Sequence, residues 1–174
     1  MSKLINTLSV LHGSPTQTRL VTPYTDGAMD EFTKFLQSPK AKQRAMIYGA
    51  TLPAFFDALK SNKKRGVDVK VIFDHTQEAG HYEHPHIEDL IANGWVDGRD
   101  FVIGTSPEAH QICHIKATWS DDRFVEDGSL NYSPSAFEQI NTIAISDWPE
   151  YAAYLNQVFE TAWSWILEHE PQYN

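Results

Sequence analysis

Two segments, separated by six residues, decide how this chain folds: His114-Ile115-Lys116-Ala117-Thr118-Trp119-Ser120-Asp121 and Gly128-Ser129-Leu130-Asn131. The first segment predicts a β-strand from Cys113 to Trp119, whose period of two places His114 and Lys116 on one face, roughly 7 Å apart. Turn-forming residues follow, and a returning strand at Phe124 to Glu126 is expected to bring the second segment beside the first.

Four polar side chains of these segments suit chemistry on a phosphodiester. Neutral His114 can attack phosphorus to give a phosphohistidine, which divides one difficult displacement into two easier ones. Lys116, Ser129 and Asn131 can stabilise the negative charge that develops on the non-bridging oxygens. A histidine also suits protonation of the leaving oxygen, because its ordinary pKa lies near neutrality.

The spacing H-x-K-x4-D-x6-G-S-x-N resembles, without a gap, the signature of the phospholipase D superfamily, the HKD motif. In that motif Asp121 is expected to orient the hairpin, and Gly128 to serve backbone geometry. The resemblance implies a site with two motif histidines, one as nucleophile and one as general acid, and no metal or cofactor. This chain has one copy of the motif. Small single-motif members, mostly nucleases, imply a homodimer that places both His114 side chains in one site.

The resemblance extends from about Ala45 to Asn141, through a strand, helix and strand unit that ends at Asp74. Strands and helices alternate along the chain. Asp26 is expected to cap one further helix, and Asp147-Trp148-Pro149-Glu150 predicts a capping box at the start of the last helix. This pattern predicts an α/β fold, a layered mixed β-sheet flanked by helices, which the resemblance implies is a phospholipase D-like half-domain that dimerises. The length suits a single domain over residues 1–174.

One position departs from the superfamily pattern. Many members carry a glutamate at the head of the strand after the motif, where it supports a catalytic histidine. Here that strand is predicted at Ile140 to Ile145, and the matching residue is Ile140 or Asn141, with Glu138 just before it. Either Glu138 takes the role through a small shift, or different residues support the histidine.

The composition of the chain restricts the cellular compartment and the binding partners that can be expected for it. Cys113 is the only cysteine, so no intrachain disulfide forms. No stretch approaches a membrane-spanning length, and Leu4 to Leu11 is too short for a secretory signal, so a cytoplasmic protein without stable membrane insertion is expected. The net charge of -9 opposes simple nucleic-acid binding, although segregated charge still permits it.

Two further groups of residues have a structural and a functional interpretation. Lys63-Lys64-Arg65 suits the last turn of a helix, where cations complement the helix dipole, or contacts substrate. The cluster of His75, His81, His84 and His86 suits a solvated loop, the rim of the active site or, with Asp74 and Glu83 nearby, a metal site. Its spacing matches no compact metal-binding pattern.

Three classes of function fit these features. The favoured hypothesis is a metal-independent phosphodiesterase, an endonuclease that acts on nucleic acid through a phosphohistidine on His114. The second is a phospholipase D-type lipid hydrolase, which uses the same chemistry on a different alcohol. The third is a catalytically silent binding module, although the intact motif argues against it.

Overall fold

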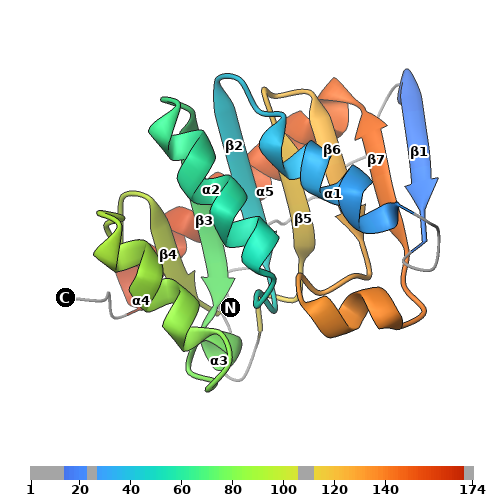
Figure 1. The fold of residues 1–174 in the computed structure, drawn as a ribbon. Coiled ribbons are helices and arrows are strands. Elements are labelled where there is room, and N and C mark those ends of the chain that lie inside the picture. Colours follow the sequence, from blue (N-terminus) through green and yellow to red (C-terminus); the bar gives the residue numbers. More distant parts are fainter. Residues whose placement is uncertain (1–13, 23–26, 106–111, 171–174) are drawn as a thin grey trace.

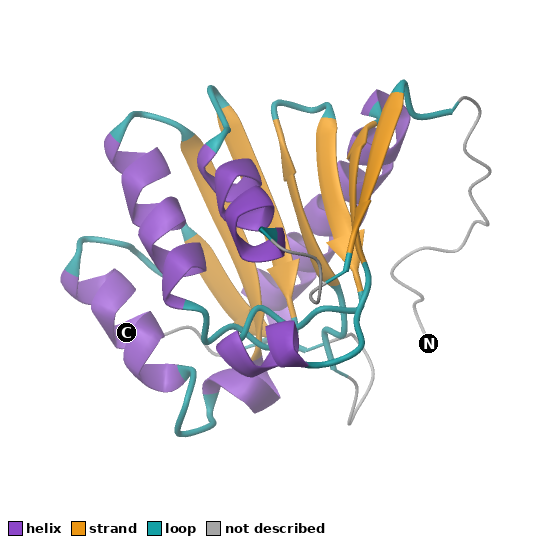
Figure 2. Ribbon diagram, turned by 45° about the vertical axis from the view of Figure 1, so that its right-hand side comes forward, coloured by secondary structure: helices purple, strands orange, loops and turns teal. Residues whose placement is uncertain are grey.

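A mixed β-sheet with helices on both faces forms the centre of the computed structural model, which describes residues 14–22, 27–105 and 112–170 (Figures 1 and 2). Its strands are β1 Gln17–Val21, β2 Lys42–Ile47, β3 Asp68–Asp74, β4 Phe101–Gly104, β5 Lys116–Ser120, β6 Phe124–Gly128 and β7 Ile143–Asp147. The helices are α1 Ala28–Gln37, α2 Pro53–Lys64, α3 His75–Glu78, α4 His84–Ala92, α5 Pro149–His169 and the 3-10 helix η1 Pro134–Glu138.

The order of the strands in the sheet is β1-β7-β6-β5-β2-β3-β4. Strands β2, β3 and β4 are parallel, and every other neighbouring pair is antiparallel. The carboxyl ends of β2 to β4 therefore lie at one edge, and β5, which is antiparallel to β2, begins there. This edge, called the site edge below, receives the residues before β5 and after β6.

Two apolar clusters cover the two faces of the sheet. Figure 1 shows α1 and α2 in front of the sheet and α5 behind it. Alternate strand residues point to each side: Val71 and Phe73 pack in the cluster that includes α1, α2 and α4, whereas Ile72 packs in the cluster of α5. In α5, Phe159 is fully buried. Burial on both faces explains why the carboxyl halves of β2 and β3 are apolar, at Ala45 to Ile47 and Val71 to Phe73.

The structure confirms the α/β class and the mixed sheet flanked by helices. The strand predicted from Cys113 begins instead at Lys116, because the preceding residues leave the ladder to form the site edge. The capping box predicted at Asp147 is wrong: Trp148 is the N-cap of α5, and the Asp147 carboxylate pairs with Arg123 at 2.6 Å. Strand β1 gave no clear signal, and the proposed helix-capping residue Asp26 lies outside the described residues.

Candidate active site

The imidazole of His114 and the ammonium group of Lys116 lie against each other at the site edge. Lys116 Nζ is 3.0 Å from His114 Nε2 and donates to the His114 carbonyl oxygen at 3.0 Å. His114 is exposed, whereas Lys116 is buried, and this burial lowers the pKa of the ammonium group. The two side chains share one space, as the period of the motif indicates, although only Lys116 belongs to the strand.

Tyr48, the residue after β2, forms a wall of this space. Its ring centroid lies 4.6 Å from that of His114 and 4.8 Å from Lys116 Nζ. Gln77 Nε2, from α3, donates to the Tyr48 hydroxyl at 2.9 Å. Neither Tyr48 nor Gln77 is near the motif in sequence, so the spacing of the motif residues did not indicate them.

Buried Asp74 positions the segment that carries His114. Its Oδ2 accepts the backbone N–H of Cys113 at 2.6 Å, and its Oδ1 accepts those of Thr76 and Gln77 at the start of α3. One carboxylate therefore ties β3 and α3 to the residue before His114. Burial, reinforced by Asp74, raises the pKa of the Cys113 thiol to about 12, which makes it a poor nucleophile at neutral pH.

Ser129 bonds to the segment that leads into β7. Its Oγ donates to Asn141 Oδ1 at 2.9 Å and accepts the backbone N–H of Thr142 at 3.0 Å. The preceding Gly128 packs so closely that a Cβ there would lie 2.0 Å from the Thr142 carbonyl oxygen. Asn141, one of the two positions matched to the superfamily glutamate, thus contacts Ser129, while Glu138 is exposed at the end of η1.

Asn131 lies on the other side of the motif, against Gly49. The backbone N–H of Tyr132 donates to the Gly49 carbonyl at 2.9 Å, and the Tyr132 carbonyl accepts the N–H groups of Thr51 and Leu52 at 2.7 Å. These bonds hold the residues after β2 beside the end of the motif. Asn131 therefore reaches the same region as Tyr48, whose ring contacts that of His114 at a tilt of 53°.

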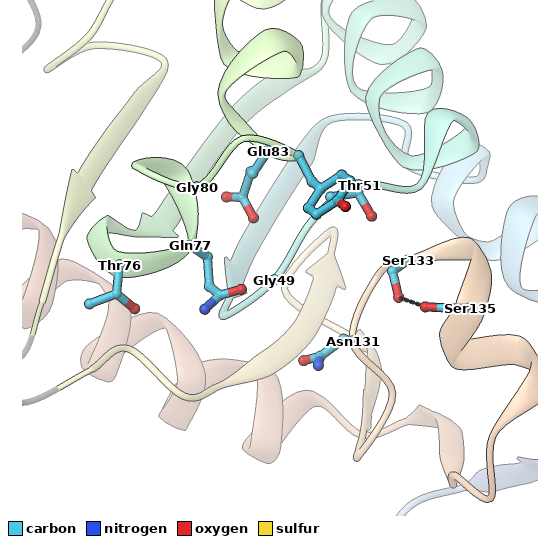
Figure 3. A pocket seen from close by; sticks show the side chains of 10 residues that line it. Gly49, Thr51, Thr76, Gln77, Gly80, Glu83, Asn131, Ser133 and Ser135 are labelled. Carbon is cyan, nitrogen blue, oxygen red and sulfur yellow. Dashed lines mark hydrogen bonds between the residues drawn. The ribbon is translucent and has the colours of Figure 1, made fainter.

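A polar cavity of about 420 Å³ opens beside Asn131 (Figure 3). Glu83 lines it and is 2% exposed, and Glu83 Oε2 accepts the backbone N–H of Ala50 at 2.7 Å. Burial raises the pKa of Glu83 to about 8, and the charges of Asp74 and Glu78 act in the same direction. The sequence indicated Glu83 only as a neighbour of the histidine cluster, because its burial is seen only in the structure.

A second cavity, of about 290 Å³, places His114 and Lys116 next to α5. Its α5 wall consists of Tyr151, Tyr154, Leu155 and Val158. The Tyr151 hydroxyl donates to Asp127 at 2.5 Å and so joins α5 to the end of β6. The motif histidine therefore has a polar cavity nearby and an aromatic and aliphatic wall on the α5 side.

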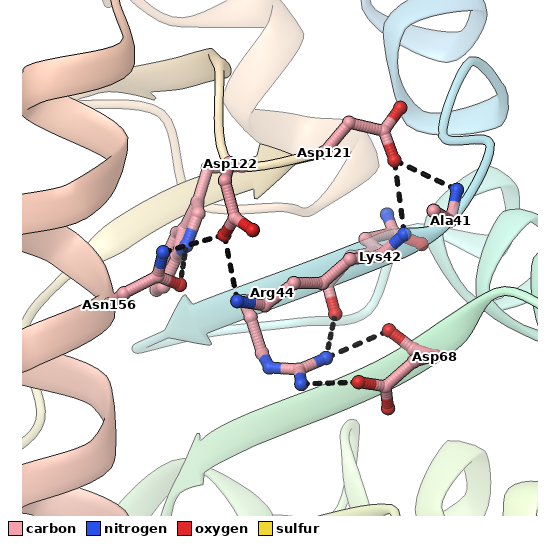
Figure 4. Close-up of polar contacts among 9 residues, drawn as sticks. Ala41, Lys42, Arg44, Asp68, Asp121, Asp122 and Asn156 are labelled. Carbon is pink, nitrogen blue, oxygen red and sulfur yellow. Dashed lines mark hydrogen bonds and ion pairs between the residues drawn. The ribbon is translucent and has the colours of Figure 1, made fainter.

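Asp121 lies at the opposite edge of the sheet, at the end of β5 (Figure 4). Its carboxylate accepts the backbone N–H groups of Lys40, Ala41 and Lys42 at 2.8 to 3.0 Å. Burial opposes ionisation of this carboxyl, but the three amide hydrogen bonds outweigh it and lower the pKa of Asp121. This geometry agrees with an orienting role for Asp121, which ties the β5–β6 turn to β2.

The basic residues at the end of α2 have structural partners. Lys63 pairs with Asp100 at 2.5 Å, and Arg65 donates to the carbonyls of Gln37 and Pro39. They also lie at the end of α2 that leads into the amino end of β3, away from the site edge. The geometry favours the structural interpretation of this basic run.

The histidine cluster lies in α3, in α4 and between them. His84 Nδ1 is 2.7 Å from Glu78 Oε1, and His86 stacks on Phe56 at 4.6 Å between ring centroids. Within the described ranges, no three histidine, cysteine, aspartate or glutamate side chains are placed to hold a metal ion.

None of the helices described is both long and apolar enough to cross a membrane.

A comparison with known protein families shows the family to which this chain belongs. The family model described as "Cardiolipin synthase, PLD-like domain" matches residues 32–163. The chain therefore belongs to the phospholipase D-like family. A search among curated protein sequences gives no match.

Solved structures with the same fold include two that the chain matches over nearly their whole length. Nuc from Salmonella typhimurium, a phospholipase D family member, is 23% identical with a TM-score of 0.73, over 85% of this chain and 94% of that chain. NucT from Helicobacter pylori is 17% identical with a TM-score of 0.70, over 85% and 96%. The phosphatidylserine synthase of Haemophilus influenzae is 14% identical with a TM-score of 0.62, over 90% and 39%. These likenesses show the fold.

Proposed function

We propose that this protein is a metal-independent phosphodiesterase, and specifically an endonuclease that forms a phosphohistidine on His114. The observation that carries the proposal is the contact between His114 Nε2 and the buried ammonium group of Lys116 at 3.0 Å. A ring nitrogen that attacks phosphorus there has a fixed cation beside it for the non-bridging oxygens. The likeness of the fold to Nuc and NucT supports nucleic acid as the substrate.

The reaction has two displacements at phosphorus. In the first, a ring nitrogen of His114 forms the P–N bond, the P–O bond to one alcohol breaks, and a general acid protonates the departing oxygen. In the second, the same group takes a proton from water, whose oxygen attacks phosphorus and breaks the P–N bond. Lys116 and Asn131 stabilise the charge on the non-bridging oxygens, and Ser129 adds a hydroxyl donor when the bond that it donates to Asn141 is exchanged for one to the substrate.

The general acid is His114 of a second copy of the chain, in a homodimer whose two-fold axis passes through the site. The single copy of the motif in the sequence supports this arrangement, because each chain supplies one such histidine. Exposure of the His114 ring also supports it. Two exposed apolar side chains are neighbours of site residues in sequence: Ile112 precedes Cys113 and His114, and Ile140, 92% exposed, precedes Asn141. They are suited to contact the second copy.

The test compares purified wild-type protein with His114→Ala on labelled DNA, RNA and phospholipid, in the presence of a chelator. His169→Ala is the matched control, since it removes another exposed histidine, at the end of α5. We expect polynucleotide cleavage by the wild type and the control, and a loss on the order of a millionfold in His114→Ala. Turnover of lipid alone would select the phospholipase alternative. If a dimeric protein turns over none of these substrates, the result would favour the hypothesis of a catalytically silent binding module.

A further inference from the structure

The cavity of Figure 3 is built for an uncharged polar group. Three segments that meet at the site edge form it: the residues after β2, the α3 region, and the residues from Asn131 to Ser135. Its described lining residues include no lysine or arginine, and most carry a hydroxyl or an amide: Thr51, Thr76, Gln77, Asn131, Ser133 and Ser135. A second phosphate would find no cation among these lining residues.

Two oxygen atoms in the wall of this cavity lack a hydrogen-bond partner. Within the part of the chain that the structure describes, Glu83 Oε1 and Asn131 Oδ1 are buried and make no hydrogen bond. Glu83 is 2% exposed, and its other oxygen already binds the backbone of Ala50. A buried polar atom without a partner is costly, which indicates that a ligand completes these bonds. Figure 3 shows the Glu83 and Asn131 side chains approaching the cavity from different segments.

An aromatic ring stands at the rim of the cavity. Tyr82 lines the cavity and is 80% exposed, with His81 as an edge-on neighbour at 5.6 Å between centroids. An exposed ring beside a polar cavity suits stacking on a planar base, which a glycerol group lacks. The volume of about 420 Å³ is within the range of small-molecule pockets.

The cavity also adjoins the catalytic side chains, to which it is linked through Gln77 and Tyr48. Gln77 lines it and holds the Tyr48 hydroxyl, and the Tyr48 ring lies on His114. Gly49 separates the two spaces: a Cβ at this position would lie 3.7 Å from atoms of both Gln77 and Asn131. A group bound in the cavity is therefore a near neighbour of a phosphate at His114.

We propose that this cavity is a nucleoside subsite, in which Tyr82 stacks on the base while Glu83, Asn131 and Thr51 bind polar atoms of the base and sugar. The subsite holds the nucleoside joined to the phosphate at His114. This inference rests on the proposed function, since it names the group that flanks the reacting phosphodiester.

The test measures binding of thymidine 3′- and 5′-monophosphate and of glycerol 3-phosphate by calorimetry. The wild type is expected to bind at least one nucleotide about tenfold more tightly than glycerol 3-phosphate, since stacking of one base has this order of magnitude. Tyr82→Ala is expected to remove this preference and Tyr82→Phe to keep it. Because Tyr82 is exposed, neither change disturbs the core. Thr51→Val, a change of similar shape, is expected to weaken nucleotide binding about fivefold through one lost hydrogen bond.

Equal binding of nucleotides and glycerol 3-phosphate by the wild type would overturn the subsite, and so would an unchanged preference in Tyr82→Ala. Turnover of bis(4-nitrophenyl) phosphate, which contains no nucleoside, tests the proposed function separately. Turnover without nucleotide preference refutes the subsite alone. Nucleotide preference without turnover of any phosphodiester refutes the phosphodiesterase and keeps the binding site.

Discussion

Glu126 allows a quantitative test of how the core beneath the site is built. It lies in β6 with 0% exposure, and the Tyr132 hydroxyl donates to Glu126 Oε2 and contacts Thr118. Its second oxygen has no hydrogen-bond partner among the described residues. Burial raises the pKa of Glu126 from 4.5 to about 8, against the smaller opposing effect of the Tyr132 bond. The folded protein therefore holds this carboxyl in its neutral form at neutral pH.

The direction of the pH dependence follows from the proton balance. Below pH 4.5 both folded and unfolded chains are protonated at Glu126, so the carboxyl adds no pH dependence. Between 4.5 and about 8 the unfolded chain releases the proton and the folded chain keeps it, so stability falls as the pH rises. At about 1.4 kcal/mol per pH unit, the loss reaches on the order of 4 kcal/mol near pH 8.

Glu126→Gln keeps the shape of the side chain and an acceptor for Tyr132, but it cannot ionise. Urea unfolding from pH 5 to 8.5, at constant protein concentration, measures the free energy of unfolding of both proteins. We expect similar stability at pH 5 and a variant that is more stable by several kcal/mol at pH 8.5. Glu83, with its pKa also near 8, remains in both proteins, so the difference isolates Glu126. Parallel pH profiles would refute the reasoning.

Three further changes test other parts of the structure. Gly128→Ala places a Cβ 2.0 Å from the Thr142 carbonyl oxygen and is expected to cost 3 kcal/mol or more, on the order of severe overpacking; a melting temperature within about 2 °C of wild type contradicts this. Asp121→Ala removes the acceptor of three backbone N–H groups and is expected to cost about 1–3 kcal/mol by urea unfolding, whereas an unchanged midpoint would deny it the orienting role. Equal mixtures of wild type and His114→Ala, after subunit exchange, are compared with wild type alone at the same total protein concentration. If two histidines form one site, only wild-type dimers are active and about one quarter of the wild-type activity is expected; one half would indicate that each chain acts independently.

Much of the fold was predictable because its signals are local. The segment Gly66 to Asp74 indicated β3, because its apolar residues at Val67, Val69 and Val71 to Phe73 end at Asp74. Pro53 and Gly66 bracket α2. The start of β5 was predicted too early, because apolar alternation continues through Cys113 while the backbone has already left the ladder. The cap at Asp147 failed because a nearby arginine competes for its carboxylate.

The sequence identifies the motif residues of the candidate site but not the residues around them. Tyr48, Asp74 and Gln77 act through contacts made across the sheet edge, and no spacing in the chain encodes those contacts. Asn141 was within the range left open for the missing glutamate, and its contact with Ser129 appears only once η1 and β7 are placed. Glu83 looks like an ordinary surface acid until burial removes it from solvent.

A covalent intermediate on His114 distinguishes the proposed two-step reaction from direct attack of water on the phosphodiester. Wild-type protein is mixed with a phosphodiester labelled at phosphorus and quenched under alkaline conditions within the first turnover, and the labelled peptide is sequenced by mass spectrometry. We expect an acid-labile phosphoryl group on His114, still esterified to the second alcohol of the substrate, absent from His114→Ala and present in the control His169→Ala. Turnover without labelled His114, or an equal label in His114→Ala, would contradict it.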